Sequence, residues 1–140
     1  MEVSVYLDAS VLVSLFIADA NSKSALGKVR RVTEPLVVSD FGAAEFASAV
    51  SRRVRMRLTA ADVAHAALAS FDAWMSANAE AVELAPSDVA ATARMLRRLE
   101  LNLRTPDAVH LAIVRRIGAA LLTLDKDMKA FARSAGVQVI

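Results

Sequence analysis

Four acidic residues, spread along the chain, have types and positions that could form one cation-binding site. Asp8 and Asp125 each follow a short apolar run, which places both after predicted strands. Asp107 lies in the first turn of a predicted helix, and Glu45 lies within another, on a face that is otherwise small or apolar. Carboxylates held close together repel one another, so they either take up protons or hold a cation. Because the chain has no cysteine, such a site favours Mg²⁺, with Mn²⁺ as a substitute.

Each acid also has an ordinary structural interpretation. Aspartate is a favoured N-cap, so Asp8 and Asp125 could each cap the helix that follows. The helix dipole alone favours an acid at the position of Asp107. Glu45 is harder to explain in this way, because a carboxylate on an apolar helix face is rarely buried without a partner. The metal-site hypothesis therefore depends on the combination of four acids and not on any one of them.

The elements expected to carry these acids alternate along the chain. Short apolar runs predict strands at residues 3–7, 36–38, 81–84, 119–124 and 137–140. Helical patterns cover residues 10–18, 21–32, 40–56, 60–77, 87–99, 106–117 and 126–134. This order predicts an α/β fold: a three-layer sandwich with a central, mostly parallel, short-stranded sheet flanked by helices. Ligands of such sheets bind at the carboxyl ends of the strands, where Asp8 and Asp125 are expected.

Residues that favour helix ends set the expected boundaries. Ser39 or Asp40 would cap the helix that carries Glu45, and Thr59 would cap the next one, with Asp62 completing a capping box. Thr105 and Pro106 predict an N-cap followed by proline at the first helical position. Gly118 predicts the end of that helix.

Length and composition limit the possible organisation of the chain. The 140 residues fit one domain spanning 1–140, and 56% of them are hydrophobic, much of this being alanine. No apolar stretch approaches the roughly 18 residues that suggest a membrane span, and residues 1–5 lack the basic start of a secretory signal. With no cysteine present, we expect a cytoplasmic protein without disulfides.

Basic residues are clustered although the formal net charge is only +2. One cluster contains Arg52, Arg53, Arg55 and Arg57, and another contains Arg94, Arg97, Arg98 and Arg104. Such clusters could follow a nucleic-acid backbone, or they could be solvated helix faces paired with nearby acids. Arg52 and Arg53 lie about two helical turns after Glu45, so they could guide a phosphate chain toward the acids.

Four segments resemble the motifs of the PIN-domain family, in order and spacing. They are VYLDAS (5–10), AEFASAV (44–50), TPDAVHLA (105–112) and LTLDKD (122–127). Chain length and motif spacing are similar to those of the VapC-type toxins of bacterial toxin–antitoxin pairs. In the fourth segment Asp125 is preferred to Asp127, because it is expected directly at a strand end.

The resemblance implies a Mg²⁺-dependent endoribonuclease with Asp8 and Asp107 as the main metal ligands. Glu45 and Asp125 would complete the site or hold a second ion. The resemblance also implies that the hydroxyls of Ser10 and Thr123 bond to the carboxylates or to metal-bound water. An ordinary strand threonine and a helix cap explain these two residues equally well. It further implies an RNA substrate, a cognate antitoxin that blocks the groove, and a homodimer.

Several alternatives remain open from the residues alone. His110, one turn after Asp107, is more often a packed or hydrogen-bonded ring than a metal ligand when no second histidine stands at ligand spacing. A non-catalytic RNA- or partner-binding module would have a broken acid set, whereas this set is complete. A response-receiver-like phosphate site matches only loosely, at Ser39 and Asp40. A DNA-directed nuclease remains open, because recognition of the 2′-hydroxyl needs only one or two contacts.

Overall fold

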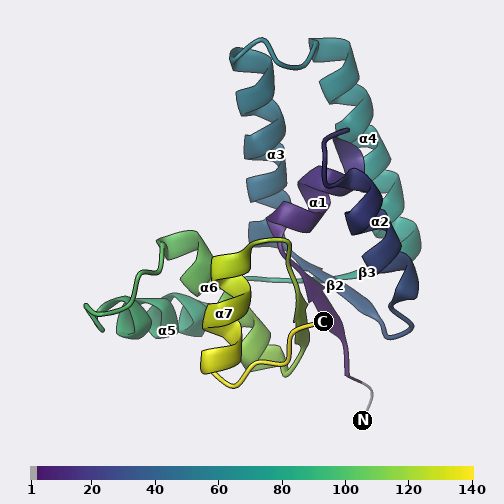
Figure 1. Cartoon of the computed structure of the whole chain (residues 1–140). Helices are drawn as coiled ribbons and strands as arrows, with labels where there is room; N and C mark the ends of the chain where they lie inside the picture. Colours follow the sequence, from purple (N-terminus) through teal and green to yellow (C-terminus); the bar gives the residue numbers. More distant parts are fainter. Residues whose placement is uncertain (1–2) are drawn as a thin grey trace.

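The computed structural model describes residues 3–140, and its strands and helices alternate along the chain (Figure 1). Residues 1 and 2, part of the N-terminal segment considered above, lie outside the described residues. The strands are β1 (Val5–Leu7), β2 (Leu36–Ser39), β3 (Ala79–Val82) and β4 (Ala120–Leu122). The helices are α1 (Ala9–Phe16), α2 (Ser22–Arg31), α3 (Asp40–Arg55), α4 (Ala61–Asn78), α5 (Pro86–Leu96), α6 (Thr105–Ile117) and α7 (Lys126–Ser134). No helix among the described residues is long and apolar enough to cross a membrane.

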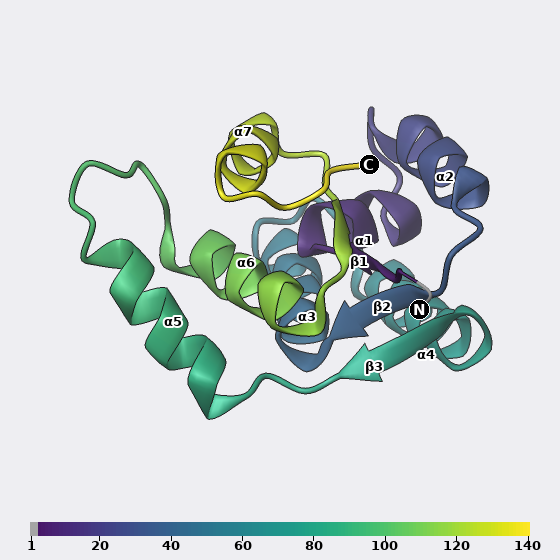
Figure 2. The ribbon, with the colours of Figure 1, turned by 90° about the horizontal axis from the view of Figure 1, so that it is seen from below.

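The four strands form one parallel sheet in the order β3-β2-β1-β4. Helices α1 to α4 lie on one side of the sheet and α5 to α7 on the other, as Figures 1 and 2 show. Each side has its own hydrophobic core, and β1 contributes to both: Val5 and Leu7 face the first core, and Tyr6 faces the second. The three-layer α/β prediction is therefore confirmed.

All five predicted strands differ in extent from those in the structure. β1 begins two residues later than expected, at Val5, and β2 ends one residue later, at Ser39. β4 has only three residues, because β1 offers three partners: Val5 pairs with Ala120, Tyr6 with Leu121 and Leu7 with Leu122. β3 begins two residues earlier than expected, because the chain becomes extended directly after α4. Residues 137–140 form no regular strand, and their pairing is one isolated bridge between Leu121 and Val139.

Helix ends follow local chemistry, with two errors in the prediction. The predicted N-cap at Thr105 is wrong, because α6 begins at Thr105 itself and Arg104 takes the cap position. Ser39 caps α3 by accepting a hydrogen bond from the Gly42 amide, and Gly118 ends α6 with φ of 68°. The predicted capping box at Thr59 is wrong, because Ala60 takes the cap position. The Thr59 hydroxyl instead accepts a hydrogen bond from Arg53 Nε at 3.0 Å, and this bond connects the end of α3 to the turn before α4.

Candidate active site

Asp8 lies where β1 ends and α1 begins, and its carboxylate is almost fully buried. Its Oδ1 accepts hydrogen bonds from the amides of Ser10 at 3.1 Å and Val11 at 3.4 Å, so the helix-cap interpretation of this residue is correct. The Ser10 hydroxyl also donates to Oδ1, at 2.5 Å, and the Thr123 hydroxyl donates to Oδ2. Burial raises the pKa of Asp8, and these hydrogen bonds partly oppose the shift. The site thus holds a buried carboxylate that four donors fix in place.

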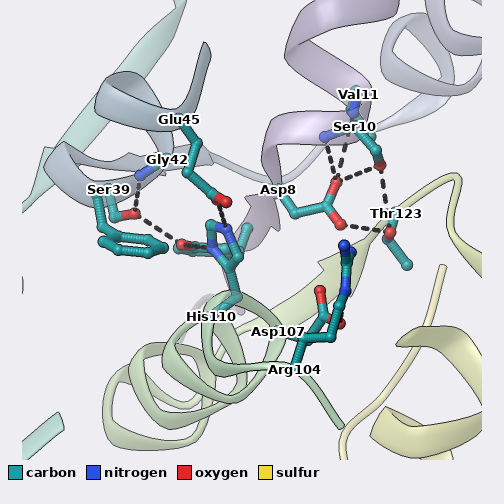
Figure 3. Close-up of polar contacts among 12 residues, drawn as sticks. Asp8, Ser10, Val11, Ser39, Gly42, Glu45, Arg104, Asp107, His110 and Thr123 are labelled. Atoms are coloured by element: carbon teal, nitrogen blue, oxygen red, sulfur yellow. Dashed lines mark hydrogen bonds and ion pairs between the residues drawn. The ribbon is translucent and has the colours of Figure 1, made fainter. Parts of the chain in front are cut away.

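Asp107 lies in the first turn of α6, and 22% of its side chain is exposed. Burial raises the pKa of this carboxyl, Arg104 lowers it, and the charge of Asp125 raises it further, so that the net shift is upward. Arg104 Nε lies 3.5 Å from Asp107 Oδ2. Figure 3 shows the Arg104 side chain extending from the start of α6 toward Asp8. A guanidinium thus places positive charge beside the Asp107 carboxylate.

Glu45 projects from α3 toward α6, where it bonds to His110 (Figure 3). One of its oxygens contacts Nε2 of the buried imidazole. The other imidazole nitrogen, Nδ1, lies 2.5 Å from the hydroxyl of Tyr6. His110 is therefore a packed, hydrogen-bonded ring, as the lack of a second histidine at ligand spacing indicated. It is also the hydrogen-bond partner that Glu45, on an apolar helix face, was expected to need.

Asp125 comes three residues after the last residue of β4 and caps α7. Its Oδ1 accepts hydrogen bonds from the amides of Asp127 at 2.9 Å and Met128 at 3.1 Å. The ordinary cap interpretation therefore describes its side chain. Its charge still reaches the site, because it raises the pKa of Asp107.

The structure brings the four acids to one end of the sheet but not into one coordination shell. Within residues 3–140, no group of three or more Asp, Glu or His side chains is close enough to hold an ion. Asp107 pairs with Arg104, Asp8 is held by the hydroxyls of Ser10 and Thr123, Glu45 is engaged by His110, and Asp125 caps a helix. The donors are all carboxylates and hydroxyls, and burial raises the pKa of two of the acids, Asp8 and Asp107. This donor set fits a hard divalent cation.

Two residues of the site were not identified from the sequence. Tyr6 was treated only as part of the first strand, although a phenol on a short buried strand, two residues before Asp8, requires a hydrogen-bond partner. Arg104 was assigned only to a basic cluster. Its position three residues before Asp107 is the helical spacing of an ion pair and could have revealed it.

Arg52 and Arg53 lie in the last turn of α3, at the far end of the helix from its cap. Among the described residues, neither forms an ion pair with a carboxylate, so the interpretation of surface arginines neutralised by nearby acids is wrong for this pair. Arg53 bonds to Thr59, as described above. Their charges remain available to an anionic ligand.

Comparison with known proteins places this geometry in a family. The model of the PIN domain matches residues 5–134. No curated protein matches the sequence closely enough to count as a relative.

Three solved structures illustrate the likeness in fold. The sarcin–ricin-loop-cleaving toxin VapC20 of Mycobacterium tuberculosis has 20% identity and a TM-score of 0.75, and the match covers 97% of this chain and 98% of that one. A VapBC2 chain from Rickettsia felis has 14% identity, a TM-score of 0.71 and coverage of 98% and 97%. A FitAcB chain from Neisseria gonorrhoeae has 13% identity, a TM-score of 0.66 and coverage of 97% and 96%. With Asp8, Glu45, Asp107 and Asp125 at one end of its sheet and a family match over nearly its whole length, the chain belongs to the PIN-domain family.

Proposed function

We propose that this chain is a divalent-cation-dependent endoribonuclease and the toxin of a toxin–antitoxin pair. The observation that carries the proposal is the pair of carboxylates, Asp8 and Asp107, which lie at the carboxyl end of the sheet and whose pKa values are raised by burial. A site that gathers negative charge either takes up protons or holds a cation. The family match and the likeness to solved VapC structures support the same function.

Asp8 and Asp107 would hold the ion, Mg²⁺ or Mn²⁺, and Glu45 and Asp125 would complete its surroundings. When bound, such an ion lowers the pKa of a water molecule and stabilises the negative charge that develops on a phosphodiester. The hydroxyls of Ser10 and Thr123 keep the Asp8 carboxylate in one orientation. No nucleophilic side chain is needed in this scheme, because water is the attacking group.

The proposed substrate is RNA and the proposed protein partner is an antitoxin. VapC20 is described as cleaving the sarcin–ricin loop, and other structures with this fold are toxin–antitoxin complexes, including one from Klebsiella pneumoniae. A homodimer and a heteromeric complex with the antitoxin are part of the proposal. The basic end of α3 provides charge for the RNA backbone.

The direct test compares an RNA with a DNA of the same sequence, each incubated with the purified chain and Mg²⁺. We expect the protein to cut the RNA at an internal phosphodiester bond and to leave the DNA intact. Cleavage of DNA alone would replace the proposal with a DNA-directed nuclease. Binding of RNA without cleavage of any of a panel of structured RNAs would support a non-catalytic binding module.

Arg104→Ala is expected to increase the affinity of the RNA-free protein for Mn²⁺. The variant loses a positive charge that pairs with Asp107 and competes with the cation, while the carboxylates stay intact. Because 76% of the Arg104 side chain is exposed, the gain should not exceed about fivefold, the value of an exposed ion pair. Arg98→Ala is the matched control, since it removes an exposed ion pair with Glu100. Equal Mn²⁺ affinities for all three proteins in a spectroscopic titration would contradict the competition.

Arg52→Ala combined with Arg53→Ala is expected to weaken RNA binding and flatten its salt dependence. Two lost phosphate contacts should lower the slope of log affinity against log salt concentration by about 1.4 for a single strand. Cleavage at saturating RNA should fall much less, since the acids are untouched. Thr59→Val is the control, because it removes the hydrogen bond to Arg53 but keeps both charges. An unchanged slope in the double variant would assign these arginines to ordinary surface charge and turn attention to Arg94, Arg97, Arg98 and Arg104.

A further inference from the structure

A single phenol links three of the elements that surround the site. The hydroxyl of Tyr6, on β1, is fully buried and lies 2.7 Å from Ser39 Oγ and 2.5 Å from His110 Nδ1. Ser39 caps α3, the helix that carries Glu45, and His110 belongs to α6, the helix that carries Asp107. Figure 3 shows the resulting row of contacts running from the Gly42 amide to the Glu45 carboxylate.

The hydrogen bonds of this row can be satisfied in only one direction. Ser39 Oγ already accepts from the Gly42 amide, and its only other partner among the described residues is Tyr6, so its proton goes to the Tyr6 oxygen. The Tyr6 proton then goes to His110 Nδ1, and the proton on Nε2 goes to Glu45. The opposite arrangement would leave the buried Ser39 proton without an acceptor and turn an imidazole lone pair toward a carboxylate.

The side chains of the row are closely packed against the backbone of α3 and against neighbouring aromatic rings. A Cβ atom added at Gly42 would lie 3.3 Å from Ser39 Oγ and 3.6 Å from His110 Cε1. The rings of Tyr6 and Phe41 both pack edge-on against His110, with centroids 5.6 Å and 5.3 Å away. The imidazole is therefore held by contacts with two aromatic rings and by hydrogen bonds at both nitrogens.

We propose that Tyr6 and His110 are positioning residues that orient Glu45 for cation binding. This inference rests on the proposed function. His110 occupies one oxygen of Glu45, so the carboxylate is held in one rotamer and its second oxygen is left for the ion. Partners of this kind, which hold a metal ligand without touching the metal, typically contribute tenfold or more to metal affinity. The donor direction makes the Gly42 amide the first donor of the row and Glu45 its final acceptor.

The first test uses the unmodified protein and nitrogen NMR of its two histidines. We expect His110 to carry its proton on Nε2 and to show an unprotonated Nδ1. His65, which is exposed, serves as the internal reference for a histidine in exchange with water. A His110 protonated on Nδ1 would overturn the proposal, because the row would then run in the wrong direction. The measurement needs neither substrate nor metal.

The second test measures Mn²⁺ affinity for Tyr6→Phe, Glu45→Ala and the combination. Tyr6→Phe removes one oxygen and should weaken Mn²⁺ binding by about tenfold. In the Glu45→Ala background the same change should have no further effect, because Tyr6 acts only through Glu45. Ser14→Ala, which removes a different buried hydroxyl and its hydrogen bond to Asp19, should leave Mn²⁺ affinity unchanged. If Tyr6→Phe does not fold, Ser39→Ala replaces it at the start of the row, with a smaller loss expected.

The outcomes separate this inference from the proposed function. If the unmodified chain binds Mn²⁺ and cleaves RNA while Tyr6→Phe binds Mn²⁺ equally well, only the positioning role fails. Equal losses for Tyr6→Phe in both backgrounds would also overturn it, since they indicate a general structural effect. If the unmodified chain neither binds Mn²⁺ nor cleaves any RNA, the proposed function fails, and the role of Tyr6 and His110 in cation binding fails with it.

Discussion

Replacing Asp8 or Asp107 with asparagine is expected to abolish RNA cleavage while the protein remains folded. Each change removes one negative charge from the pair that would hold the cation, and an amide oxygen is a much weaker ligand for Mg²⁺ than a carboxylate. Asparagine is still a good N-cap, so the start of α1 should survive the change at Asp8. Asp127→Asn is the matched control, because it changes an exposed acid in the same segment as Asp125. A wild-type cleavage rate in either site variant would show that the site is wrongly assigned.

The same variants should hold or gain stability in the absence of metal, and the gain should depend on pH. Burial raises the pKa of Asp8 in the folded state, so the folded protein binds this proton more tightly than the unfolded chain does. Charging Asp8 therefore costs folding free energy above its folded pKa, and the cost disappears as the pH falls below the unfolded value. Urea unfolding in EDTA should show the advantage of Asp8→Asn at neutral pH and its decrease toward acid pH. An advantage independent of pH would contradict the charge explanation.

Chelation of divalent cations should abolish cleavage by the unmodified protein. Addition of Mg²⁺ or Mn²⁺ in excess should restore it, whereas Ca²⁺ should not, because its longer bonds and looser geometry do not align the attacking water. Mg²⁺ should also raise the melting temperature of the unmodified protein, since a ligand that binds only the folded state shifts the unfolding equilibrium. Asp8→Asn should show a smaller rise.

Two results would oppose this metal requirement. Sustained cleavage in EDTA would exclude catalysis by an exchangeable metal ion. Equal rises in melting temperature for the unmodified protein and Asp8→Asn would place the ion at another site. Thr92→Val provides a control for the thermal measurement, because Thr92 is buried in α5 and its hydroxyl has no hydrogen-bond partner among the described residues.

The sequence predicted those parts of the fold and site that depend on local patterns. Alternating apolar runs and helical patterns predicted the three layers, and the position of Asp8 after a short strand predicted its place at the sheet end. The limits of β4 could not be predicted, because they are set by the number of residues that β1 offers as partners. The orientation of Asp125 could not be predicted either, because a cap and a metal ligand require the same residue type at the same position.

Contacts between distant segments were the least predictable. The bond from His110 to Glu45 joins residues 65 positions apart, and the bond from Tyr6 to His110 joins residues 104 positions apart. The hydrophobic periodicity of a single sequence predicts helices and strands, but it does not predict which distant side chains will pair. The sequence indicated only that Glu45 needed a partner, and the fold determined which one.

The alternation of side chains in β1 restricts how such a chain can change in length over generations. In this three-residue strand, Val5 and Leu7 face one core while Tyr6 faces the other, and Asp8 follows at once. Insertion or deletion of one residue here would exchange the two faces, moving the phenol away from Ser39 and His110. Proteins that descend from this one can therefore vary in the length of their surface loops. The spacing between Tyr6 and Asp8, by contrast, does not tolerate insertions or deletions.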